Sequence, residues 1–258
     1  ASTSGEILIN GHDILKEPEE AKKCIGYLPE IPPLYIDMTV WEYLVTVADL
    51  KKVPKAKRNA MLSQIMETVQ ITDMKKRLIK NLSKGYRQRV GIAQALIGYP
   101  EIIILDEPTV AVDPQSRNKI LEGIQELNRQ GSTIIYTSHY MEEVEQICTR
   151  IAIMDHGRVI ASGTTEELKK MIKTGETITV EALLLTEKQL QDIRNLPHVF
   201  DVHYEDQILT LRCTGAQHNL IRILNYLQSQ NLTFGRVFSE LPTLNDVFLE
   251  ITGKQLRD

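Results

Sequence analysis

Two adjacent carboxylates follow a short apolar run near the middle of the chain. The run covers residues 102–105, and Asp106, Glu107 and Pro108 come directly after it. An apolar run of this length is typical of a parallel strand that is covered on both faces. Ligands bind at the carboxyl ends of such strands, so both carboxylates are expected where chemistry occurs. One carboxylate there can hold Mg²⁺ while its neighbour polarises a water molecule.

A second group of polar residues stands upstream, at the start of a predicted helix. Residues 82–86 read Leu-Ser-Lys-Gly-Tyr, and apolar residues follow at helical spacing. The hydroxyl of Ser83, the free backbone N–H groups and the positive end of the helix dipole together can bind a phosphate. The plain alternative is that Ser83 only caps the helix.

A third group lies downstream of the carboxylates. Asp113-Pro114 follows Glu107 closely, and a second apolar strand over residues 133–137 ends at Ser138-His139. A histidine at the carboxyl end of a neighbouring strand can reach the same phosphate as the Asp-Glu pair. The alternatives are an ordinary turn residue for Asp113 and an ordinary loop residue for His139.

The order of these motifs resembles that of the ATP-binding cassette (ABC) ATPases, over roughly the first two thirds of the chain. In that family the helix-opening motif reads Leu-Ser-Gly-Gly-Gln and contacts the γ-phosphate held by the partner subunit. The chain keeps the serine and the second glycine, so the resemblance implies that Ser83 and Gly85 bind the nucleotide. Lys84 and Tyr86 depart from the family pattern.

The same resemblance assigns roles to the other motif residues. It implies that Asp106 holds Mg²⁺, that Glu107 is the general base and that His139 is the switch histidine. Asp113 belongs to the D-loop, which contacts the nucleotide. The family's D-loop reads Gly-Leu-Asp, whereas Ala-Val-Asp stands at residues 111–113, and alanine restricts the backbone more than glycine.

Residues 25–30, Ile-Gly-Tyr-Leu-Pro-Glu, match the family's Q-loop. Glu30 replaces the usual glutamine; its carboxylate can still ligate Mg²⁺ beside the nucleotide, or it is a plain solvated loop residue. The following residues 31–35, Ile-Pro-Pro-Leu-Tyr, suit an extended loop that meets a partner, although two prolines also make a rigid loop. Together with residues 82–89, this segment resembles the subfamily that powers export-type transporters with separate membrane subunits.

A P-loop of the form Gly-x-x-Gly-x-Gly-Lys-Ser/Thr occurs nowhere in the 258 residues. In the family it precedes the position of residues 3–11, and its backbone N–H groups and lysine supply most of the triphosphate binding. We therefore expect an N-terminally truncated sequence that starts where the family's first helix ends; the alternative is a genuine variant without a P-loop, which the presence of the other nucleotide-facing residues disfavours. We also expect residues 1–258 to be inactive alone.

Composition narrows the class of protein. The hydrophobic and charged fractions of 42% and 25% are ordinary for a globular chain. A net charge of −4 argues against nucleic acid as a partner. The sequence shows no apolar segment long enough to cross a bilayer and no signal peptide. Its three widely spaced cysteines fit a reducing cytoplasm. With the resemblance, we expect a bacterial cytoplasmic protein, peripheral on the inner face of the cell membrane.

The predicted fold class is α/β, with two domains. Residues 1–174 form an incomplete ABC-type P-loop NTPase core, with a helical subdomain inserted at about residues 31–98. Residues 175–258 form an α+β ferredoxin-like domain, because strands and helices alternate there as βαββαβ. The strands are expected at residues 177–185, 199–204, 208–212 and 234–238, and the helices follow Thr186 and cover residues 219–227.

The predicted function is that of the nucleotide-binding subunit of an ABC exporter. By the resemblance it is an ATP hydrolase that uses ATP and Mg²⁺. Two subunits, as a homodimer or a heterodimer, sandwich two ATP molecules and drive integral membrane subunits. The alternative is a soluble non-transport ABC protein, or a degenerate nucleotide-binding module without catalysis.

The missing P-loop leads to a first prediction. Adding Mg²⁺ and ATP to residues 1–258 is expected to leave the melting temperature unchanged in scanning calorimetry, because the main triphosphate ligands are absent. A ligand at about 100 times its Kd stabilises a protein by ~2.7 kcal/mol, so micromolar binding of ATP would raise the melting temperature and contradict this expectation.

Overall fold

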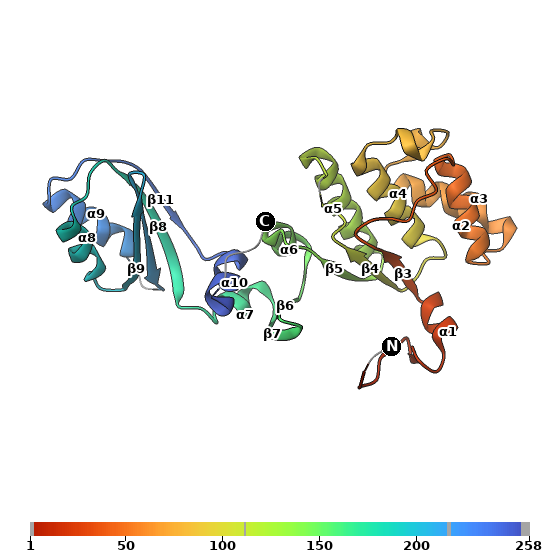
Figure 1. The fold of residues 1–258 in the computed structure, drawn as a ribbon, viewed down its shortest axis with the longest axis horizontal. Helices are drawn as coiled ribbons and strands as arrows, with labels where there is room; N and C mark the ends of the chain where they lie inside the picture. Colours follow the sequence, from red (N-terminus) through yellow and green to blue (C-terminus); the bar gives the residue numbers. More distant parts are fainter. Residues whose placement is uncertain (1–2, 111, 216–217, 254–258) are drawn as a thin grey trace. The chain divides into compact units, whose positions relative to one another are not determined.

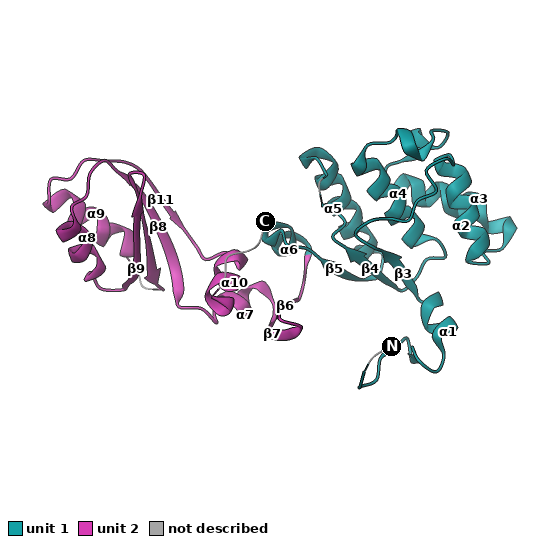
Figure 2. Cartoon of the chain, viewed as in Figure 1, with its two compact units in different colours: residues 1–147 teal, residues 148–258 magenta. Residues whose placement is uncertain are grey.

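The computed structural model describes residues 3–110, 112–215 and 218–253 (Figure 1). The chain forms two compact units, Ala1–Ile147 and Cys148–Asp258 (Figure 2). This division comes earlier than the predicted boundary after residue 174. The reason is that the hairpin of β6 (Ile151–Asp155) and β7 (Arg158–Gly163) and helix α7 (Thr165–Lys169) group with the second unit, where α7 packs against α10 (Leu244–Thr252).

A parallel three-stranded sheet forms the centre of the first unit. Its order is β3 (Ile25–Leu28), β4 (Ile102–Asp106) and β5 (Thr133–Thr137), so that the predicted strand with the two carboxylates lies in the middle. Asp106 pairs with Thr137, and this register brings the carboxyl ends of β4 and β5 level with each other. β5 covers the predicted residues 133–137, and β4 extends one residue beyond its predicted apolar run, to Asp106.

The two faces of this sheet are covered unequally. Ile103 and Leu105 are fully buried on one face. Tyr27, Ile104 and Ile135 lie opposite one another on the other face, where Tyr27 and Ile135 are each 50% exposed. The predicted burial of β4 on both faces therefore holds fully on one side only.

Helices pack against the sheet and against one another. The N-terminal segment forms β1 (Leu8–Ile9), β2 (His12–Asp13) and α1 (Pro18–Lys23). Then come α2 (Val40–Leu50), α3 (Lys55–Thr68) and α4 (Lys84–Leu96), which group together beside the sheet, with short 3₁₀ turns at Thr72–Met74 and Ile79–Asn81 (Figure 1). Helices α5 (Pro114–Arg129) and α6 (Met141–Ile147) follow β4 and β5. Helix α2 begins at a capping box in which Thr39 and Glu42 satisfy each other's backbone N–H groups.

Helix α4 lies unusually close to β3. A Cβ atom added to Gly26 would stand 2.3 Å from the carbonyl oxygen of Ala95, and one added to Gly91 would stand 2.5 Å from Leu28 Cδ1. The glycines therefore allow the backbone of the helix to approach the strand that leads to Glu30.

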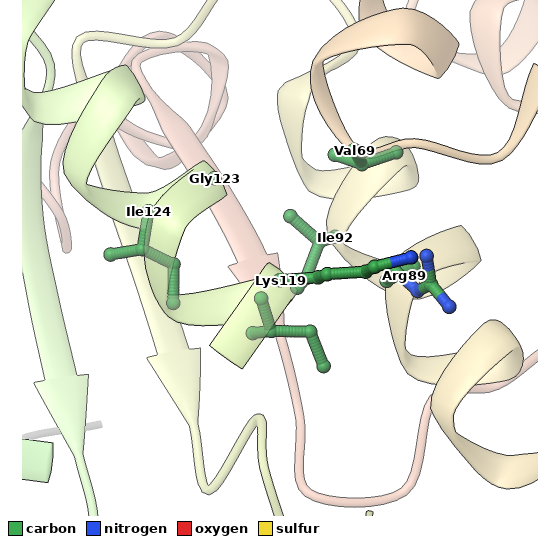
Figure 3. Close-up of a pocket in the computed structure, with 7 residues that line it drawn as sticks. Val69, Arg89, Ile92, Lys119, Gly123 and Ile124 are labelled. Atoms are coloured by element: carbon green, nitrogen blue, oxygen red, sulfur yellow. The ribbon is translucent and has the colours of Figure 1, made fainter. Parts of the chain in front are cut away.

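A small cavity lies between α4 and α5 (Figure 3). Its lining is mostly apolar, with the charged chains of Arg89 and Lys119 beside it, and Arg89 Nη1 donates to the backbone oxygen of Gln70 at 3.1 Å. Gly123 lines the same cavity from α5. A Cβ there would meet only the backbone oxygen of Thr68, at 3.7 Å.

The second unit contains the predicted ferredoxin-like domain. Its four-stranded antiparallel sheet has the order β11-β8-β10-β9, and α8 and α9 lie on one side of it (Figure 1). The bounds are β8 (Thr174–Ala182), α8 (Glu187–Arg194), β9 (Val199–Glu205), β10 (Ile208–Thr214), α9 (Asn219–Ser229) and β11 (Phe234–Glu240). Asp206 and Gln207 have φ values of 48° and 65°, as a two-residue hairpin turn requires. The predicted βαββαβ order is confirmed.

The two glycine environments generate a second prediction. Gly26→Ala is expected to lower the free energy of unfolding by ~1–3 kcal/mol, because the methyl group would overlap the α4 backbone. Gly123→Ala is the matched control and should raise it by ~0.5–1 kcal/mol, because alanine favours the helix and has room. Urea unfolding followed by circular dichroism measures both changes. Equal effects of the two variants would show that the close contact between α4 and β3 is absent in solution.

Candidate active site

Asp106 and Glu107 leave the sheet at the end of β4, and Thr137 on β5 holds both of them. The Thr137 hydroxyl donates to Asp106 Oδ1 at 2.6 Å and accepts from the backbone N–H of Glu107 at 3.1 Å. Glu107 has a φ of +47°, a left-handed conformation that is uncommon for a residue with a side chain. The hydrogen bond from the Glu107 N–H to the Thr137 hydroxyl helps to keep the backbone in this conformation.

His139, which follows the end of the neighbouring strand β5, lies against Glu107. Its Nδ1 stands 3.0 Å from Glu107 Oε2, and the two side chains are 44% and 22% exposed. The histidine ring also lies beside Tyr140, with 4.2 Å between the ring centroids. Asp106, Glu107 and His139 therefore form one partly exposed cluster at the carboxyl edge of the sheet.

Ser83, Gly85 and Asp113 gather where the N-terminus of α4 meets that of α5. Ser83 caps α4 by accepting from the N–H of Tyr86 at 3.4 Å, and Asp113 caps α5 by accepting from the N–H of Ser116 at 2.9 Å. That hydrogen bond lowers the pKa of the Asp113 carboxyl below its usual range. A Cβ on Gly85 would stand 2.9 Å from Ser116 Cβ, so the glycine lets the two helix ends approach. Both capping residues are exposed.

Glu30 lies beyond the carboxyl end of β3, which pairs with β4, and its side chain is exposed. Its backbone oxygen accepts a hydrogen bond from Nε2 of the buried Gln88 at 3.2 Å. The loop is thus held from α4, while the carboxylate stays accessible. Ala111 of the predicted D-loop lies outside the described residues.

Sequence reasoning missed three residues that shape these groups. Thr137, Gln88 and Ser116 hold the predicted residues by hydrogen bonds or close contact. Of these three residues, only Thr137 could have been predicted from the sequence. It is the last residue of the strand next to β4, and in a parallel pair that residue must lie opposite the carboxylates.

The carboxylates suit Mg²⁺ only when a ligand supplies further oxygens. Within the described residues, no group of three or more His, Cys, Asp or Glu residues is arranged to hold a metal ion. Mg²⁺ is usually bound by one or two carboxylates together with substrate phosphates. Asp106 and the accessible Glu30 fit that mode of binding. No helix in the described part of the chain is both long and apolar enough to cross a membrane.

Comparisons with known proteins agree with this architecture. The ABC transporter family model matches residues 1–110, and the model for the C-terminal domain of DrrA1-3-like ATP-binding proteins matches residues 163–252. The linearmycin resistance ATP-binding protein LnrL of Bacillus subtilis (strain 168) is 37% identical over 257 residues, which are 99% of this chain and 83% of that protein. The Nod factor export ATP-binding protein I of Rhizobium etli is 29% identical over 256 residues, or 99% of this chain and 78% of that protein.

A solved structure supports the same relationship. The ATP-binding subunit of an ABC transporter superposes with a TM-score of 0.59 and 28% identity, over 66% of this chain and 70% of that chain. ABC ATP-binding subunits bind and hydrolyse ATP and work as dimers with membrane subunits. The predicted family, fold class and exporter function are confirmed by these likenesses. The chain belongs to the ABC transporter family, as an exporter-type ATP-binding subunit with a DrrA-like C-terminal domain.

Proposed function

We propose that Asp106, Glu107 and His139 form the hydrolytic centre of this subunit. The observation that carries the proposal is the 3.0 Å contact between His139 Nδ1 and Glu107 Oε2 beside Asp106. Glu107 accepts a proton from the water that attacks the γ-phosphate of ATP, and His139 keeps its carboxylate turned toward that water. With Nδ1 engaged by Glu107, Nε2 is the ring atom of His139 left to face the nucleotide, and it donates to a phosphate oxygen when it also carries a proton.

Asp106 and Glu30 hold Mg²⁺ in this proposal. The bound ion would neutralise charge on the phosphates of ATP. The hydroxyl of Thr137 donates to Oδ1 of Asp106 and so leaves Oδ2 for the ion. Glu30 reaches the same edge of the sheet from the neighbouring strand β3.

Ser83, Gly85 and Asp113 serve the nucleotide of a second subunit. They form a separate group from the carboxylates, and the exposed N-terminus of α4 offers backbone N–H groups and a positive dipole end to a phosphate. A second copy or a related chain would place its own nucleotide there. In a dimer, Ser83, Gly85 and Asp113 of each subunit would contact the nucleotide of the other, so that the two subunits enclose two ATP molecules.

The loop after Glu30 is proposed as the contact with integral membrane subunits. Its apolar residues are unusually accessible, since Ile31 is 81% exposed, Tyr35 53% and Ile36 50%. Exposed apolar side chains in one short segment mark a protein interaction site. Contact with membrane subunits there would place the protein on the inner face of the cell membrane.

The role of Glu107 generates a third prediction. In a form of the protein in which a family P-loop segment precedes Ala1, Glu107→Gln is expected to keep ATP binding and to lower kcat by ~10²–10⁴, because the general base is lost. Phosphate release measures kcat, and equilibrium dialysis measures binding. Glu101→Gln, at an exposed position just before β4, is the matched control and should leave both values unchanged. Wild-type turnover by Glu107→Gln would remove this residue from the mechanism.

The shared site generates a fourth prediction, made in the same P-loop-bearing form. Ser83→Arg and Glu107→Gln are each expected to be inactive alone, whereas their mixture should recover activity. A mixed dimer keeps one site with an intact Glu107 from one subunit and an intact Ser83 from the other. Random mixing should restore about a quarter of wild-type activity, because half of the dimers are mixed and each keeps one of its two sites. If Ser83 served the nucleotide of its own subunit, the mixture would be as inactive as its parts.

A further inference from the structure

Glu143 on α6 carries the one buried carboxylate among the described residues, with 4% of its surface exposed. Three hydroxyl groups donate to its Oε2 atom: Thr109 at 2.7 Å, Ser138 at 3.4 Å, and Tyr136. Arg117 Nε stands 3.2 Å from the other oxygen, Oε1. A carboxylate removed from water is costly unless it is paired, and these four partners supply that pairing for Glu143.

Two of the donors, Thr109 and Ser138, occupy the loops that carry the proposed hydrolytic residues, and the third lies near the end of β5. Thr109 follows Glu107 by two residues, and Ser138 directly precedes His139. Tyr136 is the β5 residue next to Thr137, which holds Asp106 and Glu107. Burial, together with the hydrogen bond to Glu143, raises the pKa of the Tyr136 phenol, so this group stays a proton donor. One carboxylate therefore joins the end of β4 to the end of β5.

The ion pair with Arg117 extends the same network to α5 and to the histidine loop. The Arg117 guanidinium lies over the ring of Tyr140, 4.6 Å from its centroid, and that ring lies beside His139. The backbone N–H of Tyr140 donates to Ser138 Oγ at 3.0 Å. The position of His139 is thus set by contacts that lead back to Glu143.

We propose that Glu143 is a positioning residue that fixes the contact between His139 and Glu107. It does not touch substrate; it acts by holding the loops of both residues. This inference rests on the proposed hydrolytic function, which it deepens. A residue with a purely structural role would change the free energy of unfolding and leave the contact between His139 and Glu107 intact in the folded protein.

The tautomer of His139 in the 258-residue chain gives a test that needs no activity. Because Nδ1 faces the Glu107 carboxylate, neutral His139 should carry its proton on Nδ1. ¹⁵N NMR of the histidine rings measures this at a pH of ~8.5, about two units above the ordinary pKa of a histidine side chain. Glu143→Gln is expected to shift His139 toward the Nε2–H tautomer. Glu142→Gln, the same change at the exposed neighbouring position on α6, should leave it unchanged.

Two further variants separate positioning from charge and from folding. Tyr136→Phe and Ser138→Ala remove a donor to Glu143 without changing the net charge, and each should shift the tautomer in the same direction. If Glu143→Gln fails to fold, these two variants still test whether the network around Glu143 sets the tautomer of His139. Folded variants of Glu143, Tyr136 and Ser138 that all keep the wild-type tautomer would overturn the proposal.

Kinetics in the P-loop-bearing form link the contact to the reaction. Glu143→Gln is expected to lower kcat about tenfold or more, a part of the ~10²–10⁴ that a general base contributes, with KM changed less than about twofold. A wild-type kcat together with a shifted tautomer would refute a role in hydrolysis. A wild-type protein that does not hydrolyse ATP would instead refute the proposed function, while the tautomer measurement still reports on positioning.

Discussion

The parallel register of β4 and β5 is the constraint on which the candidate site depends. It places Thr137 opposite Asp106, where one hydroxyl serves both Asp106 and the backbone of Glu107. A slip of one residue would turn Thr137 to the other face of the sheet and remove both hydrogen bonds. The left-handed conformation of Glu107 costs about 1–2 kcal/mol, which two hydrogen bonds of ~0.5–1.5 kcal/mol each can offset. The geometry of the carboxylates is therefore a property of the strand pair.

Local patterns predicted the elements of this fold well, because each pattern has a short-range cause. The apolar strands at residues 102–105 and 133–137, and the strands and helices of the ferredoxin-like domain, formed close to where they were expected. The meeting of Glu107 with His139 was also predictable, since neighbouring parallel strands end at the same edge. The boundary between the two units was not predictable from local patterns, because it depends on the packing of α7 against α10, which is far away in the sequence.

Apart from Thr137, the residues that hold the site could not be found from the sequence. Glu143 stands in an ordinary helix beside the similar Glu142, and only the fold decides which of them is buried. Glutamate has no preference for positive φ, so the conformation of Glu107 has no local signal. For Ser83 the alternative to nucleotide binding is a helix cap, and for Asp113 it is an ordinary turn residue; in the structure both residues cap helices. A cap still leaves the exposed oxygen and neighbouring N–H groups open to a ligand, so the two roles are compatible.

The attachment of the ferredoxin-like domain bears on how such proteins diversify. Its first and last strands, β8 and β11, are neighbours, and Thr177 near the start pairs with Glu240 at the end. The chain therefore enters and leaves the domain about one strand spacing apart, ~4.8 Å. The carboxylate of Glu250 on α10 accepts hydrogen bonds from Lys173 and Thr174. These bonds connect the segment that follows the domain to the segment that precedes it. A domain with such closely spaced ends can be gained, exchanged or lost in one genetic event, while the path of the surrounding chain stays the same.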